Sequence, residues 1–75
     1  MDSLIEVKID TEYIKLDQFM KYAGITNTGG EAKNLIMDGI IKVNGNIEFS
    51  RGKKLKPGDM VEFEGNKYKI LKAYI

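Results

Sequence analysis

The apolar side chains near the N-terminus alternate with charged ones. Residues 4–9, LIEVKI, follow mostly the period of a strand with one buried face. Residues 16–23, LDQFMKYA, instead place apolar side chains three and four positions apart, as in a short amphipathic helix that Gly24 is suited to end. The same spacing predicts a second helix from about Gly29 to Asp38, with Gly39 as its stop.

The second half of the chain has the pattern of strands joined by tight turns. Asn44-Gly45 separates IIKV from NIEF and is suited to a two-residue hairpin. Lys56-Pro57-Gly58-Asp59 is a turn signal, and Gly65-Asn66 is predicted as the turn between MVEFE and KYKILKAYI. The order of strand, two helices and several strands predicts a small α+β domain.

Length and composition restrict the chemistry that this chain can perform. Its 75 residues predict one domain over 1–75, with room for only a thin core. It has no Cys and no His, which removes thiolate nucleophiles, imidazole bases, most zinc ligands and disulfides, so no metal or cofactor is expected. The acidic first ten residues lack the pattern of a signal peptide and nothing is long enough to cross a membrane, so a cytoplasmic location is expected.

Charge is unevenly distributed along the chain. The total is only +1, but residues 1–20 have a net charge of −3 and residues 21–56 a net charge of +4, while residues 57–75 are balanced. A basic middle segment within one domain favours binding to a polyanion.

The start of the second helix is a candidate anion site. Thr28 and Glu31 have the spacing of a capping box, in which the Thr28 hydroxyl accepts from the Glu31 amide and the Glu31 carboxylate returns to the Thr28 amide. The amides of Gly29 and Gly30 are then left without helical partners and without Cβ atoms to block a phosphate, and Lys33 lies one turn further on. The alternative is that the glycines only relieve crowding between the two helices.

A second basic element is the loop at residues 50–59, SRGKKLKPGD, which contains Arg51, Lys53, Lys54 and Lys56. Such a run is often only a solvated loop. If the Asn44-Gly45 hairpin returns the loop to the helix start, both elements share one face and can follow a phosphate backbone. Tyr13 and Tyr22 are the aromatic residues expected near that face. The remaining aromatics are expected mostly in the core: Phe19, Phe49, Phe63, Tyr68 and Tyr74.

Several short motifs together resemble a known family. They are Leu16-Asp17-Gln18-Phe19-Met20, Thr28 to Lys33, Leu35-Ile36, Gly39, Ile41, Val43-Asn44-Gly45 and Gly58-Asp59-Met60-Val61. The pattern, over about residues 12–63, resembles the ribosomal protein S-four-type (αL motif) RNA-binding domain, and GGEAK with RGKKLKPGD is similar to its short stand-alone bacterial members, the YaaA-like proteins.

The resemblance implies two helices packed on a small curved, mainly antiparallel sheet, with RNA held by the second helix's start and the loop after the hairpin. Carried over by position, the RNA-binding candidates are Thr28, Gly29, Gly30, Lys33, Arg51, Lys53 and Lys54, with Lys21 as a weaker contact at the rim.

Together with this resemblance, the sequence predicts a non-catalytic, monomeric binder of structured RNA with no specificity for DNA. The resemblance implies ribosomal RNA or a ribosome assembly intermediate as the target. Arg51 is the single arginine in the chain, which makes the expected affinity modest because lysine contacts phosphate as a mobile point charge. A protein-interaction adaptor that uses the acidic N-terminal third is the alternative. A ubiquitin-like sulfur carrier is disfavoured because the chain ends in Ala73-Tyr74-Ile75 rather than in diglycine.

Overall fold

The structure is a computed structural model that describes residues 3–73. The described residues form two helices and seven strands, and their order agrees with the predicted elements except for two short strands, at 14–15 and 54–55, that the sequence pattern did not predict. Their bounds are β1 Ser3–Ile9, β2 Ile14–Lys15, α1 Leu16–Tyr22, α2 Gly29–Met37, β3 Lys42–Val43, β4 Asn46–Ile47, β5 Lys54–Leu55, β6 Met60–Phe63 and β7 Asn66–Lys72.

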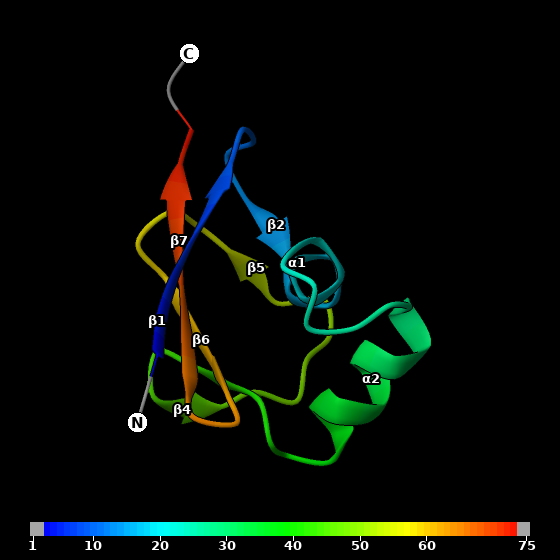
Figure 1. The fold of residues 1–75 in the computed structure, drawn as a ribbon. Helices are drawn as coiled ribbons and strands as arrows, with labels where there is room; N and C mark the ends of the chain where they lie inside the picture. The colour runs from blue at the N-terminus through cyan, green and yellow to red at the C-terminus, as the bar shows by residue number, and fades with distance from the viewer. Residues whose placement is uncertain (1–2, 74–75) are drawn as a thin grey trace.

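Five of the strands form one sheet, in the order β1-β7-β6-β3-β4 (Figure 1). β1 runs parallel to β7, whereas the other neighbours are antiparallel, so the sheet is mixed and mainly antiparallel. A separate two-stranded sheet pairs β2 with β5, which joins the residue before α1 to the basic loop. No local pattern in the sequence predicted this second sheet.

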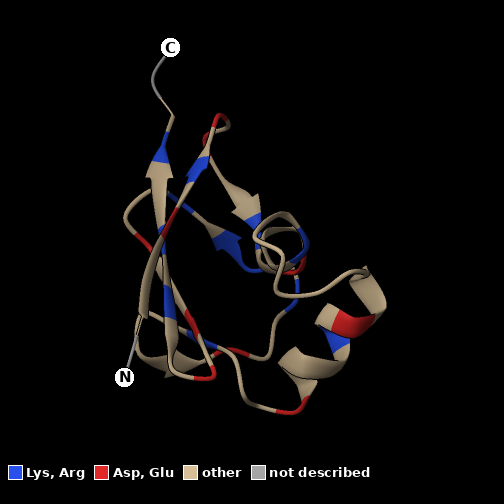
Figure 2. Cartoon of the chain, viewed as in Figure 1, with Lys and Arg blue, Asp and Glu red and all other residues tan. Residues whose placement is uncertain are grey.

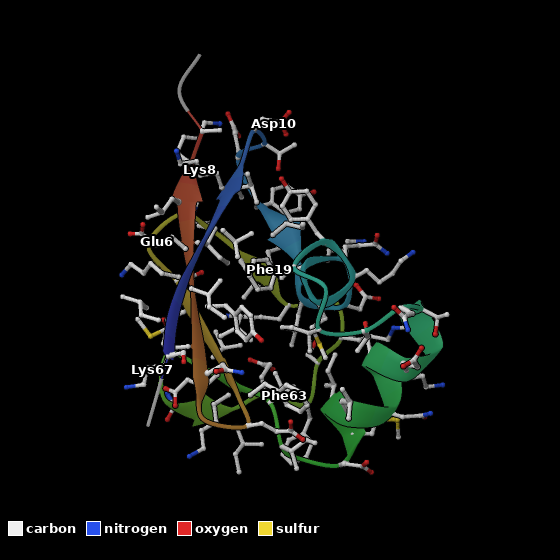
Figure 3. The ribbon with its side chains drawn as sticks, in the orientation of Figure 1. Glu6, Lys8, Asp10, Phe19, Phe63 and Lys67 are labelled. Atoms are coloured by element: carbon white, nitrogen blue, oxygen red, sulfur yellow. The ribbon has the colours of Figure 1, made fainter. Side chains whose placement is uncertain are left out.

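The two helices lie on one side of the sheet and enclose the core with it (Figure 1). Figure 3 shows Phe19 between α1 and the strands, where it is fully buried. The spacing of apolar residues explains which face of each helix is buried, since Leu16, Phe19 and Met20 of α1 and Ala32 and Ile36 of α2 are all inaccessible. The predicted α+β class with two helices on a small sheet is therefore confirmed.

The local stop and turn signals are mostly confirmed. Gly24 and Gly39 follow the two helices with φ of 78° and 76°. Asn44 and Gly45 both have positive φ, 51° and 86°, as a type I′ hairpin requires. The turn predicted at Gly65-Asn66 is wrong by one residue. Phe63 pairs with Asn66, so the two loop residues with positive φ are Glu64 and Gly65.

One expectation about burial is confirmed and one is wrong. Residues 4–9 form a strand with one partly buried face, since Ile9 is buried and Val7 packs against the core, whereas Leu4 lies on the other face with Glu6 and Lys8 and is 62% exposed. Phe49, expected in the core, is 63% exposed because it directly follows β4, which is an edge strand of the sheet. Tyr74 and the last residue of the predicted final strand lie outside the described residues.

Within residues 3–73, no helix has the length and apolar character that a membrane crossing requires.

Candidate nucleic-acid interface

The start of α2 is capped as the sequence predicts, with one difference. Thr28 has an extended backbone, and its hydroxyl oxygen accepts from the Glu31 amide at 3.1 Å. The Glu31 carboxylate does not return to the Thr28 amide but lies 3.5 Å from the Thr28 hydroxyl, which donates to it. The Thr28 side chain therefore caps the helix start, and within residues 3–73 the amides of Gly29 and Gly30 have no hydrogen-bond acceptor.

The two glycines at this start do not separate the helices. A Cβ added at Gly30 would meet only the Oγ of Thr28, at 3.8 Å, and one added at Gly29 would meet only Nη2 of Arg51, also at 3.8 Å. Both distances are ordinary van der Waals contacts and neither neighbour belongs to α1. The alternative that these glycines relieve crowding between α1 and α2 is therefore wrong, and Arg51 is the side chain nearest to Gly29.

Arg51 is held in this place by α1. Its Nε donates to Oδ2 of Asp17 at 3.1 Å, and the Asp17 amide donates to the Arg51 carbonyl at 3.1 Å. The Asp17 side chain is only 10% exposed and its Oδ1 also accepts from the Gln18 amide, so it is a fixed anchor. Half of the Arg51 side chain stays exposed. With Nε occupied by Asp17, the terminal guanidinium nitrogens are left for a ligand at the start of α2.

The basic loop is also fixed through its backbone. The Leu16 amide donates to the Lys53 carbonyl at 2.8 Å, so the loop satisfies amides at the start of α1 that a helix itself leaves free. Lys54 in β5 lies opposite Lys15 in β2, and its Nζ is 5.0 Å from the centre of the Tyr13 ring. Figure 2 shows basic residues on β5 and in the first half of α2.

The remaining candidates lie on exposed positions of the two helices. Lys33 follows Gly29 by four residues and Gly30 by three, so it lies on the same face of α2. Lys21 follows Asp17 by four residues and lies on the face of α1 that carries the Arg51 contact. The structure thus brings Thr28, Gly29, Gly30, Lys33 and Arg51 to one place, with Lys21 beside it and Lys53 and Lys54 further along the loop.

Two residues near this surface were missed from the sequence. Asp17 was assigned to the first helix and to the family motif but not to the site, although an aspartate among buried residues is rarely left without a charged partner. Lys15 was assigned to the acidic N-terminal segment, but its pairing with Lys54 places it beside the basic loop. Among residues 3–73 no group of three or more acidic residues is arranged to hold a metal ion.

Replacing Thr28 by alanine should lower the free energy of unfolding by about 1 kcal/mol, because the Glu31 amide loses its acceptor. Thr28→Ser keeps the hydroxyl and is the matched control. Chemical denaturation followed by circular dichroism measures both variants, and an unchanged midpoint for Thr28→Ala would show that the cap contributes nothing.

Comparison with known proteins agrees with this architecture. A family model described as the S4 domain matches residues 7–71, so the chain belongs to the S4 domain family. The match includes part of β1 and nearly all of β7, beyond the segment at residues 12–63 that shows the resemblance in sequence.

Two relatives are informative. The chain is 44% identical over 59 residues to the probable ribosome maturation protein RlbA of Bacillus subtilis (strain 168), a match that covers 79% of this chain and 83% of that protein. The solution structure of YbcJ from E. coli, described as revealing an αL motif involved in RNA binding, matches with a TM-score of 0.64. That match covers 95% of this chain and 89% of the other at 24% identity, so it supports the fold alone.

Proposed function

We propose that this chain is a non-catalytic, monomeric RNA-binding domain that acts in the cytoplasm on ribosomal RNA or a ribosome assembly intermediate. The observation that supports it best is the position of Arg51 beside Gly29, which brings the two basic elements of the sequence together and supports a single anion site there. The S4 family, and a relative named as a probable ribosome maturation protein, support the RNA and ribosomal parts of the proposal.

The site fits a phosphate group. The amides at the start of α2 carry the positive end of the helix dipole, and Gly29 and Gly30 have no side chains to keep a phosphate away. Nη2 of Arg51 lies 3.8 Å from the position that a Gly29 Cβ would occupy, and charge-assisted hydrogen bonds from arginine to phosphate are strong. Lys33 adds a mobile positive charge from the next turn.

The surrounding lysines extend this site into a face. Lys21, Lys53 and Lys54 are exposed, and Lys15 lies opposite Lys54. Because the loop is tied to α1 by backbone hydrogen bonds, its lysines start from fixed positions and lose less freedom on binding. We propose that this face follows consecutive phosphates of a folded RNA, while α2 and Arg51 hold one of them.

The proposed face should select RNA by shape rather than by sequence. Its groups contact phosphates, and Tyr13, the aromatic residue nearest the basic loop, has the Lys54 ammonium over its ring. We therefore expect a folded ribosomal RNA fragment to bind more tightly than an unstructured oligonucleotide of the same length, with little effect of exchanging base pairs. A DNA duplex of the same sequence should show no specific binding.

Fluorescence anisotropy with these three nucleic acids measures the preference at one fixed salt concentration. Tight binding to the unstructured oligonucleotide that single base changes abolish would contradict recognition of shape. Absence of binding to any RNA would favour the adaptor function that the acidic N-terminal segment suggested.

A further inference from the structure

A second surface lies where α2 ends and β3 and β4 begin. Ile40, Ile47 and Phe49 are 46%, 50% and 63% exposed. A Cβ added at Gly39 would lie 3.4 Å from the Phe49 ring and 4.0 Å from Ile47, so these side chains lie together. The ladder pairs Lys42 with Ile47, and its continuation places residue 40 opposite residue 49 on the same sheet face. We call Ile40, Ile47 and Phe49 the apolar patch.

The apolar patch borders an acidic rim. Ile40 lines a shallow hollow of about 140 Å³ together with Glu62 and Glu64, and Lys42 is its one basic residue. The last turn of α2 contains no basic residue and is capped by Asp38, so the negative end of the helix dipole is not neutralised there. Figure 2 shows acidic residues in the loop after α2 and in the turn between β6 and β7. Glu62 lies between Lys42 and Lys67, its partners on the two neighbouring strands. The edge of the patch thus carries three acidic residues, Asp38, Glu62 and Glu64, against these two lysines, and is net negative around an apolar centre.

We propose that the apolar patch is a docking site for a basic polypeptide segment of a partner protein, with an aromatic or aliphatic side chain as its anchor. An exposed phenylalanine beside two exposed isoleucines gives such an anchor an apolar surface to pack against, and aromatic side chains such as Phe49 contribute strongly to interface energies. The acidic rim attracts lysine and arginine and repels RNA phosphates. This charge complementarity selects a basic polypeptide over RNA.

The apolar patch and the phosphate site lie at opposite ends of α2. Arg51 lies beside Gly29 at the start of the helix, whereas Phe49 lies beside Gly39 just after its end. Nine helical residues separate the two ends by roughly 13 Å along the axis. Both ligands therefore have room to bind at once, and the docking site does not depend on RNA binding.

Three synthetic peptides of equal length provide the probe. The first alternates arginine with leucine, the second replaces each arginine by glutamate, and the third replaces each leucine by serine. In an NMR titration of the full chain, we expect only the first to shift the amides of Gly39, Lys42 and Ile47 in a saturable manner. Equal binding of the glutamate peptide would overturn the charge argument, and equal binding of the serine peptide would overturn the apolar one.

Two pairs of variants test the location. Phe49→Ser should weaken binding of the arginine–leucine peptide roughly tenfold, whereas Leu4→Ser, which removes an equally exposed apolar residue on the opposite edge strand, should leave it unchanged. Glu62→Gln should weaken binding and Glu6→Gln should not. If Phe49→Ser does not fold by circular dichroism, Ile47→Ser takes its place.

Two further measurements separate this docking site from other uses of the surface. Phe49→Ser should bind the folded RNA fragment as the unmodified chain does, and loss of RNA binding would place Phe49 in the RNA interface instead. Sedimentation of the unmodified chain should show a monomer. If it shows a dimer that Phe49→Ser dissociates, the apolar patch binds a second copy of the chain and the proposal is wrong. Unchanged peptide binding by Phe49→Ser would likewise overturn the proposal.

Discussion

Replacing Arg51 by alanine should weaken binding to a folded ribosomal RNA fragment by about ten- to a hundredfold. The guanidinium is held beside Gly29 with its terminal nitrogens free, so its loss removes a fixed charge-assisted contact to phosphate. Hydrogen bonds that involve a charged group contribute about 1.5–3 kcal/mol, and each 1.4 kcal/mol is a factor of ten in affinity. Fluorescence anisotropy at constant salt measures the change.

The matched controls separate the geometry of Arg51 from its charge. Arg51→Lys keeps the charge but loses the planar fork and the Nε bond to Asp17, so it should recover only part of the affinity. Lys72→Ala removes a positive charge from β7, where the Nζ lies 3.5 Å from the Asp10 carbonyl and away from α2, and should have little effect. Equal losses from Arg51→Ala and Lys72→Ala would contradict a defined phosphate site.

Folding of these variants has to be established first, because Arg51 also contacts a nearly buried carboxylate. Circular dichroism at the assay temperature gives that control.

The Asp17→Asn variant tests how Asp17 positions Arg51. It removes a negative charge near the proposed phosphate while keeping an oxygen acceptor for Nε of Arg51. If Asp17 positions Arg51 by its charge, this variant should bind RNA more weakly, whereas tighter binding would show that Asp17 only opposes the ligand.

The elements that the sequence predicted well depend on neighbours along the chain. Thr28 and Glu31 are three residues apart, and the hydroxyl-to-amide bond between them sets the start of α2. Asn44-Gly45 forms its hairpin because both residues tolerate positive φ. The turn predicted at Gly65-Asn66 was placed one residue too late, because the register of β6 and β7 pairs Phe63 with Asn66 and leaves Glu64 and Gly65 as the loop.

The features that local patterns missed depend on contacts between distant segments. β1 pairs in parallel with β7, more than 60 residues away, and no local pattern predicts that pairing. The candidate residues at the α2 start and in the basic loop could be proposed from charge and family resemblance. The connection between the α2 start and the basic loop could not be proposed from the sequence. It depends on the contact between Arg51 and Asp17, which are 34 residues apart and meet only in the folded structure.

Salt dependence should be the largest effect on RNA binding. With roughly four phosphate contacts, from α2, Arg51 and two lysines, affinity should fall by about two orders of magnitude between 50 and 200 mM salt, using duplex slopes as a guide. Each contact releases about one counterion, so the slope of the logarithm of the affinity against the logarithm of the salt concentration gives the approximate number of phosphate contacts. A slope near zero would mean that phosphates contribute little.

Comparison of that slope among four charge reversals tests the proposed face most directly. Lys33→Glu and Lys54→Glu reverse charges on the proposed face, in α2 and β5. Lys69→Glu and Lys72→Glu reverse charges in β7, which contributes no residue to the proposed site. All four remove a lysine that is not deeply buried, so stability should change by only about 0.5 kcal/mol. We predict that the first two each weaken binding and flatten the slope by about one or more, while the last two leave both unchanged. Equal losses from all four, or no loss from Lys33→Glu and Lys54→Glu, would contradict an RNA interface at the start of α2.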